Sequence, residues 1–129
     1  MAHANEDLLS RGYAAYGSGD MDTIQTLFDD DIVWHAGGSN QLAGEYHGFQ
    51  EIMGFFGRVM ELTGGTFRIE VHDILANDTH GVVLATFHAE RDGQTTALRS
   101  ADVWHLADGK ATEHWSCFED QAAADKLFS

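Results

Sequence analysis

The second half of the chain alternates between apolar and polar residues in four long runs that short turn signals separate. The turn signals are Asn77-Asp78, Asp92-Gly93 and Asp108-Gly109. Asp-Gly between two alternating runs is typical of a β-hairpin, because both central residues of that turn must tolerate a positive φ. The runs themselves span residues 66–76, 79–91, 94–106 and 110–118. The pattern therefore predicts a meander of four long antiparallel strands.

The first half shows the spacing of amphipathic helices instead. Leu8, Leu9, Tyr13 and Tyr16 fall on one face of a helix that we expect over residues 5–17. Further helices are expected after residue 20, over residues 49–62 and, beyond the meander, over residues 121–128.

The segment between the second and third helices carries weaker signals. Three consecutive aspartates, Asp29 to Asp31, are expected in a solvated turn, because acidic side chains are unfavourable at a helix C-terminus. Ile32–His35 is a candidate for a short strand, and residues 37–40 are expected to form a loose loop.

Helices followed by a meander predict an α+β fold, with one domain over residues 1–129. Long strands twist and curl. We therefore expect a conical, strongly curved, mostly antiparallel sheet wrapped around a pocket that the three N-terminal helices close. Such a pocket is the first place to seek a function.

The charge balance narrows the classes of partner. The 21 acidic and 7 basic side chains give a formal net charge of −14, which repels phosphate backbones and anionic lipid. Neither nucleic acid nor a membrane is therefore an expected partner. The single cysteine, Cys117, cannot form an internal disulfide and is interpreted as a small buried apolar residue. Without a secretory pattern at the N-terminus, a cytoplasmic location is expected.

Four sequence elements, spread over nearly the whole chain, resemble one known family. They are Tyr13-Ala-Ala-Tyr16-Gly-Ser-Gly-Asp20, Asp31-Ile-Val-Trp-His35, Tyr46-His-Gly48 and Asp108-Gly109-Lys-Ala-Thr-Glu-His-Trp115. Together with the order of elements, they resemble the SnoaL-like branch of the nuclear transport factor 2-like superfamily, which includes polyketide cyclases and ketosteroid isomerase relatives. The resemblance implies the conical fold. It implies several functions, since this scaffold carries isomerases, cyclases, hydrolases, dehydratases and non-catalytic proteins.

The resemblance also implies positions for acid–base groups. Counting from the aspartates before the first strand places His35 where ketosteroid isomerases have a general-base aspartate. The spacing along the third meander strand places Asp102 where they have a protonated aspartate that stabilises charge on a carbonyl oxygen. Their tyrosine on the first helix corresponds to Gly12, with Tyr13 beside it. On this basis His35 and Asp102 are the candidate catalytic residues.

Strand alternation sorts the meander residues without reference to any family, and it places Asp102 on one face with Leu98, Ser100 and Trp104. The resemblance implies that this face looks into the pocket. The expected ligand-binding residues are Tyr13, Tyr16, Phe56, Phe87, Leu98, Ser100, Trp104, His114, Ser116 and Phe118. A buried carboxylate must be protonated, paired or hydrogen-bonded. A salt bridge or backbone contact is therefore the alternative role of Asp102, and capping of a strand end is that of His35.

Two classes of function remain open for a protein that binds a small, mostly apolar molecule in such a pocket. One is a cofactor-free isomerase or cyclase in which His35 moves the proton and Asp102 stabilises the developing charge. The other is a non-catalytic module for ligand binding or protein interaction. No cofactor and no metal are expected, since His88 and Glu90 share a strand face without an evident third ligand.

The opposite face of the meander is also apolar. It carries Ala101, Val103, Trp115 and Cys117, a continuous patch of the kind that marks an interaction surface. A homodimer that buries this face is therefore expected, as in many proteins of the family that the chain resembles.

Overall fold

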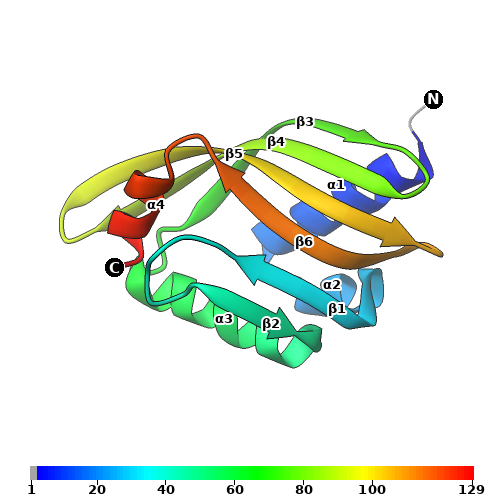
Figure 1. The fold of residues 1–129 in the computed structure, drawn as a ribbon, viewed down its shortest axis with the longest axis horizontal. Helices are drawn as coiled ribbons and strands as arrows, with labels where there is room; N and C mark the ends of the chain where they lie inside the picture. Colours follow the sequence, from blue (N-terminus) through cyan, green and yellow to red (C-terminus); the bar gives the residue numbers. More distant parts are fainter. Residues whose placement is uncertain (1–2) are drawn as a thin grey trace.

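A curved six-stranded sheet forms the body of the molecule, and the computed structural model describes it within residues 3–129 (Figure 1). Its strands are β1 (Phe28–Ala36), β2 (Gly44–His47), β3 (Arg68–Ala76), β4 (His80–Arg91), β5 (Gln94–Ala107) and β6 (Lys110–Phe118). They lie in the order β2-β1-β6-β5-β4-β3. Neighbouring strands are antiparallel except β1 and β6, which run parallel. The predicted α+β fold and four-stranded meander are confirmed, and the sheet stays open between its β2 and β3 edges.

Helices close the sheet from several sides. They are α1 (Ala4–Ser18), α2 (Met21–Leu27), α3 (Gly48–Leu62) and α4 (Gln121–Leu127). Helix α1 packs against β3 and β4, α3 against β1 and β2, and α4 against β5 and β6. Asp20 caps α2 as expected, because its Oδ1 accepts a hydrogen bond from the backbone N–H of Thr23 at 3.2 Å.

The two Asp-Gly turns have the backbone that their sequence predicts. Asp92 and Asp108 have φ values of 52° and 51°, and the glycines that follow them have φ values of 78° and 74°. Two successive positive φ values match the twist of the flanking strands in a two-residue hairpin. These turns set the registers of β4 with β5 and of β5 with β6.

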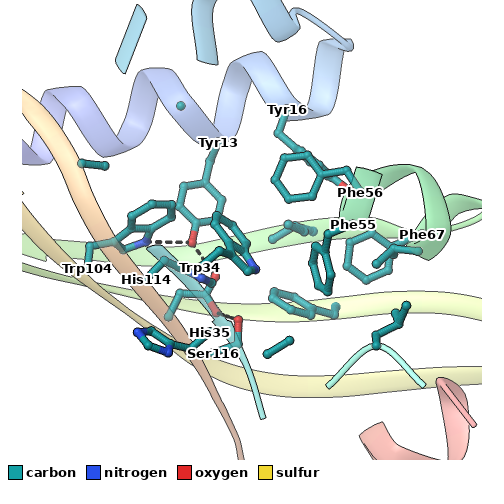
Figure 2. Close-up of a pocket in the computed structure, with 18 of the residues that line it drawn as sticks. Tyr13, Tyr16, Trp34, His35, Phe55, Phe56, Phe67, Trp104, His114 and Ser116 are labelled. Carbon is teal, nitrogen blue, oxygen red and sulfur yellow. Dashed lines mark hydrogen bonds between the residues drawn. The ribbon is translucent and has the colours of Figure 1, made fainter. Parts of the chain in front are cut away.

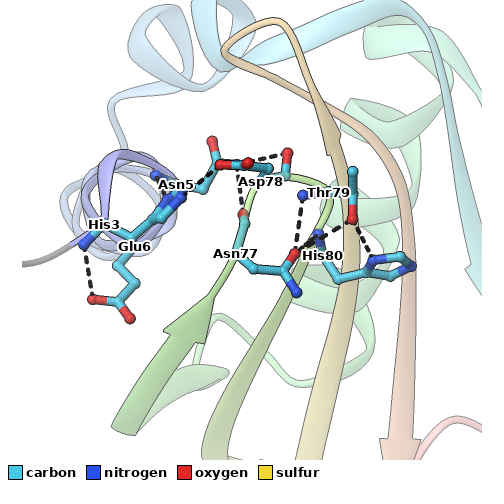
Figure 3. A network of polar contacts seen from close by, with 7 residues as sticks. All are labelled: His3, Asn5, Glu6, Asn77, Asp78, Thr79 and His80. Carbon is cyan, nitrogen blue, oxygen red and sulfur yellow. Dashed lines mark hydrogen bonds and ion pairs between the residues drawn. The ribbon is translucent and has the colours of Figure 1, made fainter.

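The third turn, between β3 and β4, is held by side chains and is tied to the start of α1 (Figure 3). The Asn77 Oδ1 accepts from the backbone N–H groups of Thr79 and His80, at 3.0 and 2.8 Å. From α1, the Asn5 Nδ2 donates to the Asn77 carbonyl at 2.9 Å, and the His3 Nε2 lies 2.9 Å from the Asp78 Oδ1. The turn therefore anchors the N-terminal end of α1 to the far end of the sheet.

The structure corrects three predictions about local structure. Asp29 to Asp31 belong to β1, because the strand already begins at Phe28, whose side chain is buried in the core. A shift in the β1–β6 register between Phe28 and Val33 lets the aspartates reach solvent within the strand. Strand β2 was not predicted, and its four residues pair with Val33–Ala36. Cys117 is exposed, because it lies on the outer face of β6.

The core lies between the inner face of the sheet and the helices. Ile32 on β1, Ile52 on α3 and Val83 on β4 have no exposed surface. Each such side chain stabilises the fold by roughly 1.5–3 kcal/mol relative to an exposed position. Gly81 on β4 leaves room for α1, because a Cβ at this position would lie 2.4 Å from the Leu9 Cδ1. The absence of a side chain there allows α1 to approach the sheet closely.

We expect Gly81→Ala to lower the free energy of unfolding by about 1–3 kcal/mol, the usual cost of overpacking a core. Gly57→Ala is the matched control, because a Cβ at Gly57 on the exposed side of α3 meets nothing within 4 Å. Alanine there should raise the helix stability by up to about 1 kcal/mol. Urea unfolding of both variants measures the difference. Equal stabilities would contradict the close packing of α1 at Gly81.

Candidate functional site

A cavity of about 120 Å³ lies between the inner face of the sheet and the helices (Figure 2). Its volume is similar to that of a cavity of about 150 Å³ that admits a benzene ring. Aromatic side chains make up much of the lining: Tyr13, Tyr16, Phe28, Trp34, Phe55, Phe56, Phe67, Phe87, Trp104, Phe118 and Phe128. Helix α4 also contributes, through Gln121 and Ala124. The predicted pocket is therefore present, and the fourth helix helps to close it as well.

Asp102 lies on β5 at the inner end of this cavity, with 1% of its surface exposed. Its Oδ1 accepts hydrogen bonds from the hydroxyls of Ser100 and Ser116, at 2.8 and 3.0 Å. Its Oδ2 accepts a hydrogen bond from the Tyr13 hydroxyl. Three hydroxyl donors suit an ionised carboxylate, which can only accept hydrogen bonds.

The Tyr13 hydroxyl connects Asp102 to a further polar group. It accepts a hydrogen bond from the Trp104 Nε1 at 3.2 Å, and the two rings meet edge to face with centroids 6.2 Å apart. Because Tyr13 lies on α1 and Trp104 on β5, the contact fixes the phenol in one orientation over the sheet. Sequence counting had assigned the family's tyrosine position to Gly12, yet the Tyr13 side chain is the one that reaches Asp102.

Burial shifts the ionisation of both groups. Removal from water raises the pKa of Asp102 above its ordinary value, and the hydrogen bonds from Tyr13, Ser100 and Ser116 partly offset this rise. Burial and the nearby Asp102 charge raise the pKa of the Tyr13 phenol well above its ordinary value. Burial also raises the pKa of Tyr16 to about 12. Both phenols are therefore neutral at any physiological pH, and the Asp102 carboxyl holds its proton more readily than a carboxyl in water does.

His114 on β6 is the other polar group of the cavity wall. Its ring stacks on Trp34, with centroids 3.7 Å apart and an angle of 27° between the planes. The Trp104 ring lies 4.3 Å away. Only 1% of the residue is exposed. Burial, reinforced by His35, lowers the pKa of His114 well below its ordinary value, so the imidazole is neutral.

His35 does not face Asp102, so the structure does not bring the two candidate catalytic side chains together. Its Nε2 lies 2.6 Å from the Glu113 Oε2 and its Nδ1 lies 3.4 Å from the Glu45 Oε1. Its ring stacks on Trp115, with centroids 4.7 Å apart and an angle of 5°. These partners lie on the outer face of the sheet. His35 borders the cavity, but its ring nitrogens are engaged by carboxylates on the other side.

The alternation along β1 explains the error. The side chains of Ile32 and Trp34 point into the core and cavity, whereas Val33 and His35 lie on the opposite face. Trp34 therefore occupies the place in the cavity that was predicted for His35. The stacking of Trp34 against His114 was not predicted. The apolar Ile32, two residues earlier on the same face of the strand, is the signal that could have placed Trp34 inside.

Most of the other predicted ligand-binding residues line the cavity, as expected. They are Tyr13, Tyr16, Phe56, Phe87, Trp104, His114, Ser116 and Phe118. Two are not part of the lining: Leu98 is buried in the core with 3% exposed, and Ser100 contributes through its bond to Asp102. Phe55 and Phe67 line the cavity without having been predicted. Their apolar side chains carry no signal that separates cavity wall from core.

Within residues 3–129, no cluster of three or more histidine, cysteine, aspartate or glutamate side chains is arranged to hold a metal ion. In the same range, no helix combines the length and apolar character that a membrane crossing requires.

The chain matches the profile of the SnoaL-like domain family over residues 9–114. An uncharacterised protein of Mycobacterium tuberculosis is 28% identical over 128 residues, which cover 98% of this chain and 97% of that protein.

Among solved structures, Bal32a from a soil-derived mobile gene cassette superimposes with a TM-score of 0.93 at 32% identity, covering 99% of this chain and 98% of the other. The structure of TerC co-crystallised with polyporic acid has a TM-score of 0.86 at 25% identity, covering 98% of both chains.

The raised pKa of Asp102 predicts a pH-dependent difference between the protein and its Asp102→Asn variant. Below the unfolded pKa both are uncharged at this position. As pH rises from about 4, the unfolded carboxyl ionises freely while the folded one resists, so the natural protein loses stability relative to the variant. We therefore expect the melting temperature of the variant minus that of the natural protein to increase between pH 4 and pH 8.

Asp125→Asn is the matched control for this measurement. Hydrogen bonds, first from Asn40, lower the pKa of the Asp125 carboxyl. The stabilising effect of the Asp125 carboxylate is therefore present above the unfolded pKa and is lost as pH falls. The melting temperature of Asp125→Asn minus that of the natural protein should accordingly decrease as pH rises, opposite to the trend for Asp102→Asn. A pH-independent difference for Asp102→Asn would show that burial does not raise this pKa.

Proposed function

Because the chain belongs to the SnoaL-like family, we propose that this protein binds a small, mostly apolar carbonyl compound and performs cofactor-free acid–base chemistry on it. The proposed reactions are isomerisation and aldol-type cyclisation. The observation that carries the proposal is Asp102, a carboxyl with a raised pKa at the inner end of an aromatic cavity. Perturbed acids in a concave site are the usual acid–base groups of enzymes.

In the proposed mechanism Asp102 takes and returns the proton. The C–H bond next to the ligand carbonyl breaks, an O–H bond forms on Asp102, and the electron pair moves into an enolate. Once Asp102 is protonated, it needs the hydrogen bond from Tyr13 less, and the Tyr13 hydroxyl can turn toward the enolate oxygen. When the enolate is conjugated with a further C=C bond, returning the proton from Asp102 to the far carbon completes an isomerisation. Alternatively, attack of the enolate on a second carbonyl forms a ring, and the alkoxide so formed takes the proton back from Asp102.

Aromatic walls favour a ring-containing ligand. The edge-to-face contacts of Tyr16 with Phe56 and Phe67, at 5.0 and 6.4 Å between centroids, show the kind of packing such walls offer. That TerC, a structural neighbour of this chain, was co-crystallised with polyporic acid supports a small-molecule ligand for this chain as well.

A binding module without turnover is the second candidate, and one observation favours it. Both oxygens of Asp102 already accept hydrogen bonds from protein hydroxyls, and the residue is 1% exposed. A carboxyl that serves only to organise Tyr13 and the serines would show the same arrangement. The two candidates differ in whether Asp102 exchanges a proton with the ligand.

The test first measures ligand binding and then measures exchange of the hydrogens next to the ligand carbonyl. In thermal-shift measurements, we expect small aromatic ketones and polyporic acid to raise the melting temperature, because they bind the folded state. Nucleotides and sugar phosphates should not. For ketones that bind, proton NMR in deuterated water then measures exchange of the hydrogens next to the carbonyl. We expect Asp102→Asn to slow this exchange by roughly a hundredfold or more, the usual effect of losing an acid–base group.

Ser18→Ala is the control, because the Ser18 hydroxyl bonds only within α1, to the Ala15 carbonyl. Binding without any protein-dependent exchange would establish the non-catalytic module. Stabilisation by sugar phosphates but not by ketones would overturn the proposed ligand class.

We also propose that two copies of the chain associate through the outer sheet face. Besides Val103 and Trp115, this face carries Leu84 and Leu75, with 41% and 50% of their surface exposed. Large exposed apolar side chains on one continuous face are typical of an interface. A two-fold arrangement would bring this patch against itself.

Light scattering at micromolar concentration should give the mass of a dimer. Leu84→Glu should shift the mass toward that of the monomer, because it places a charge in the middle of the patch. Met60→Glu is the control, since Met60 on α3 is 38% exposed but lies away from this face. A monomeric mass for the natural protein would contradict the proposal.

A further inference from the structure

The His114 imidazole has a ring nitrogen without a partner. Within residues 3–129 its Nδ1 has no hydrogen-bond partner, although the residue is buried, with 1% of its surface exposed. The ring lies against Trp34 and Trp104 in the wall of the cavity (Figure 2). Buried polar atoms are nearly always hydrogen-bonded, so an unpaired one points to a missing partner.

Packing alone does not account for a histidine at this position. A phenylalanine would fill the space beside the two tryptophan rings and leave no polar atom unsatisfied. A neutral imidazole carries one proton, and we assign it to Nε2, which leaves a free lone pair on Nδ1. Nδ1 is therefore an acceptor, and its natural partner is a hydroxyl or N–H group.

The position of His114 relative to Asp102 sets what one ligand can reach. On the paired strands β5 and β6, Trp104 lies opposite His114 and Asp102 lies opposite Ser116. His114 and Asp102 are therefore diagonal neighbours on the inner face, with backbones about 7–8 Å apart. A molecule the size of one substituted ring can span the distance between them.

We propose that His114 is a specificity-determining residue that accepts a hydrogen bond from a hydroxyl group of the ligand. This inference rests on the proposed function and narrows it: the ligand is a ring compound that carries a hydroxyl in addition to its carbonyl. The carbonyl end lies toward Tyr13 and Asp102, and the hydroxyl satisfies Nδ1. Since Nδ1 is shielded from solvent in this structure, the Trp34 and His114 rings must shift slightly apart for the hydroxyl to reach it. The lowered pKa of His114 suits this role, because a neutral imidazole can accept such a bond.

Matched ligands test the proposal. Acetophenone carries only the carbonyl, 3- and 4-hydroxyacetophenone add the hydroxyl, and the methoxy counterparts keep the oxygen but cannot donate a hydrogen bond. We expect the natural protein to bind one hydroxyacetophenone about tenfold more tightly than acetophenone and its methoxy counterpart, the effect of one buried hydrogen bond. In His114→Phe this preference should vanish, while the affinity for acetophenone stays within about threefold. His114→Asn should restore part of the preference, because its Oδ1 can lie near the position of Nδ1.

Nitrogen NMR of the natural protein provides a readout that does not depend on any variant. Binding of the hydroxyacetophenone should shift the Nδ1 resonance of His114 in the direction of an accepted hydrogen bond, and acetophenone should not. Equal affinity for all ring ketones, with an unmoved Nδ1 resonance, would overturn the role of His114 and leave the proposed function standing. If no ring ketone binds the natural protein, both proposals fail.

Discussion

A carboxyl group at the depth of Asp102 is compatible with a stable fold only because hydroxyl groups surround it. Moving an ionised carboxylate from water into an apolar interior costs several kcal/mol, even after the surroundings relax. Ser100, Ser116 and Tyr13 offset part of this cost by donating to its two oxygens. The donors come from β5, β6 and α1. The bonds that make the buried carboxyl tolerable therefore also join the first helix to the sheet, and the cavity has its polar end where they meet.

The same sheet shows how far environment decides what a histidine does. His35 lies on the outer face of the sheet, where its ring nitrogens meet two carboxylates, those of Glu113 and Glu45. His114 lies on the inner face against two tryptophan rings, where burial lowers the pKa of its imidazole well below the ordinary value and keeps it neutral. The two residues are on adjacent strands. Their chemistry differs because the sheet separates water and carboxylates on one face from an aromatic cavity on the other.

Much of the fold could be predicted from the sequence, because its signals are local. The Asp92-Gly93 and Asp108-Gly109 turns require a backbone that few other residue pairs adopt, and they determine the hairpins on either side. Strand β2 lacks such a signal. Its four residues are a strand only because β1 offers them an unpaired edge, and that edge is a property of the tertiary structure.

The candidate site was predicted in part for a similar reason. Asp102 could be identified because a carboxyl on the buried face of a strand needs hydrogen-bond partners. No such partner is evident next to it in the sequence, so the residue stands out. The error with His35 arose because counting along a short strand leaves its phase ambiguous by one residue, and one residue exchanges the two faces. Tyr13 illustrates the opposite case. A shift of one position along a helix turns a side chain by only about 100°, so the phenol still reaches the cavity.

The two attachments of α1 have a consequence for how a ligand reaches the cavity. The helix is fixed at its start, where Asn5 and His3 bind the β3–β4 turn, and again two residues past its midpoint in sequence, where Tyr13 binds Asp102. The two anchors are about 12–15 Å apart at 1.5 Å per residue, so α1 can neither slide nor swing without breaking one of them. The segment after β1 and helix α4 form another part of the cavity wall, through Gly37, Asn40, Gln121 and Ala124. There the half-buried Asp125 carboxylate accepts hydrogen bonds from the backbone N–H of Ser39 and the side-chain amide of Asn40, at 3.0 and 2.8 Å. This carboxylate holds the segment after β1 against α4, and water can replace each of its hydrogen bonds.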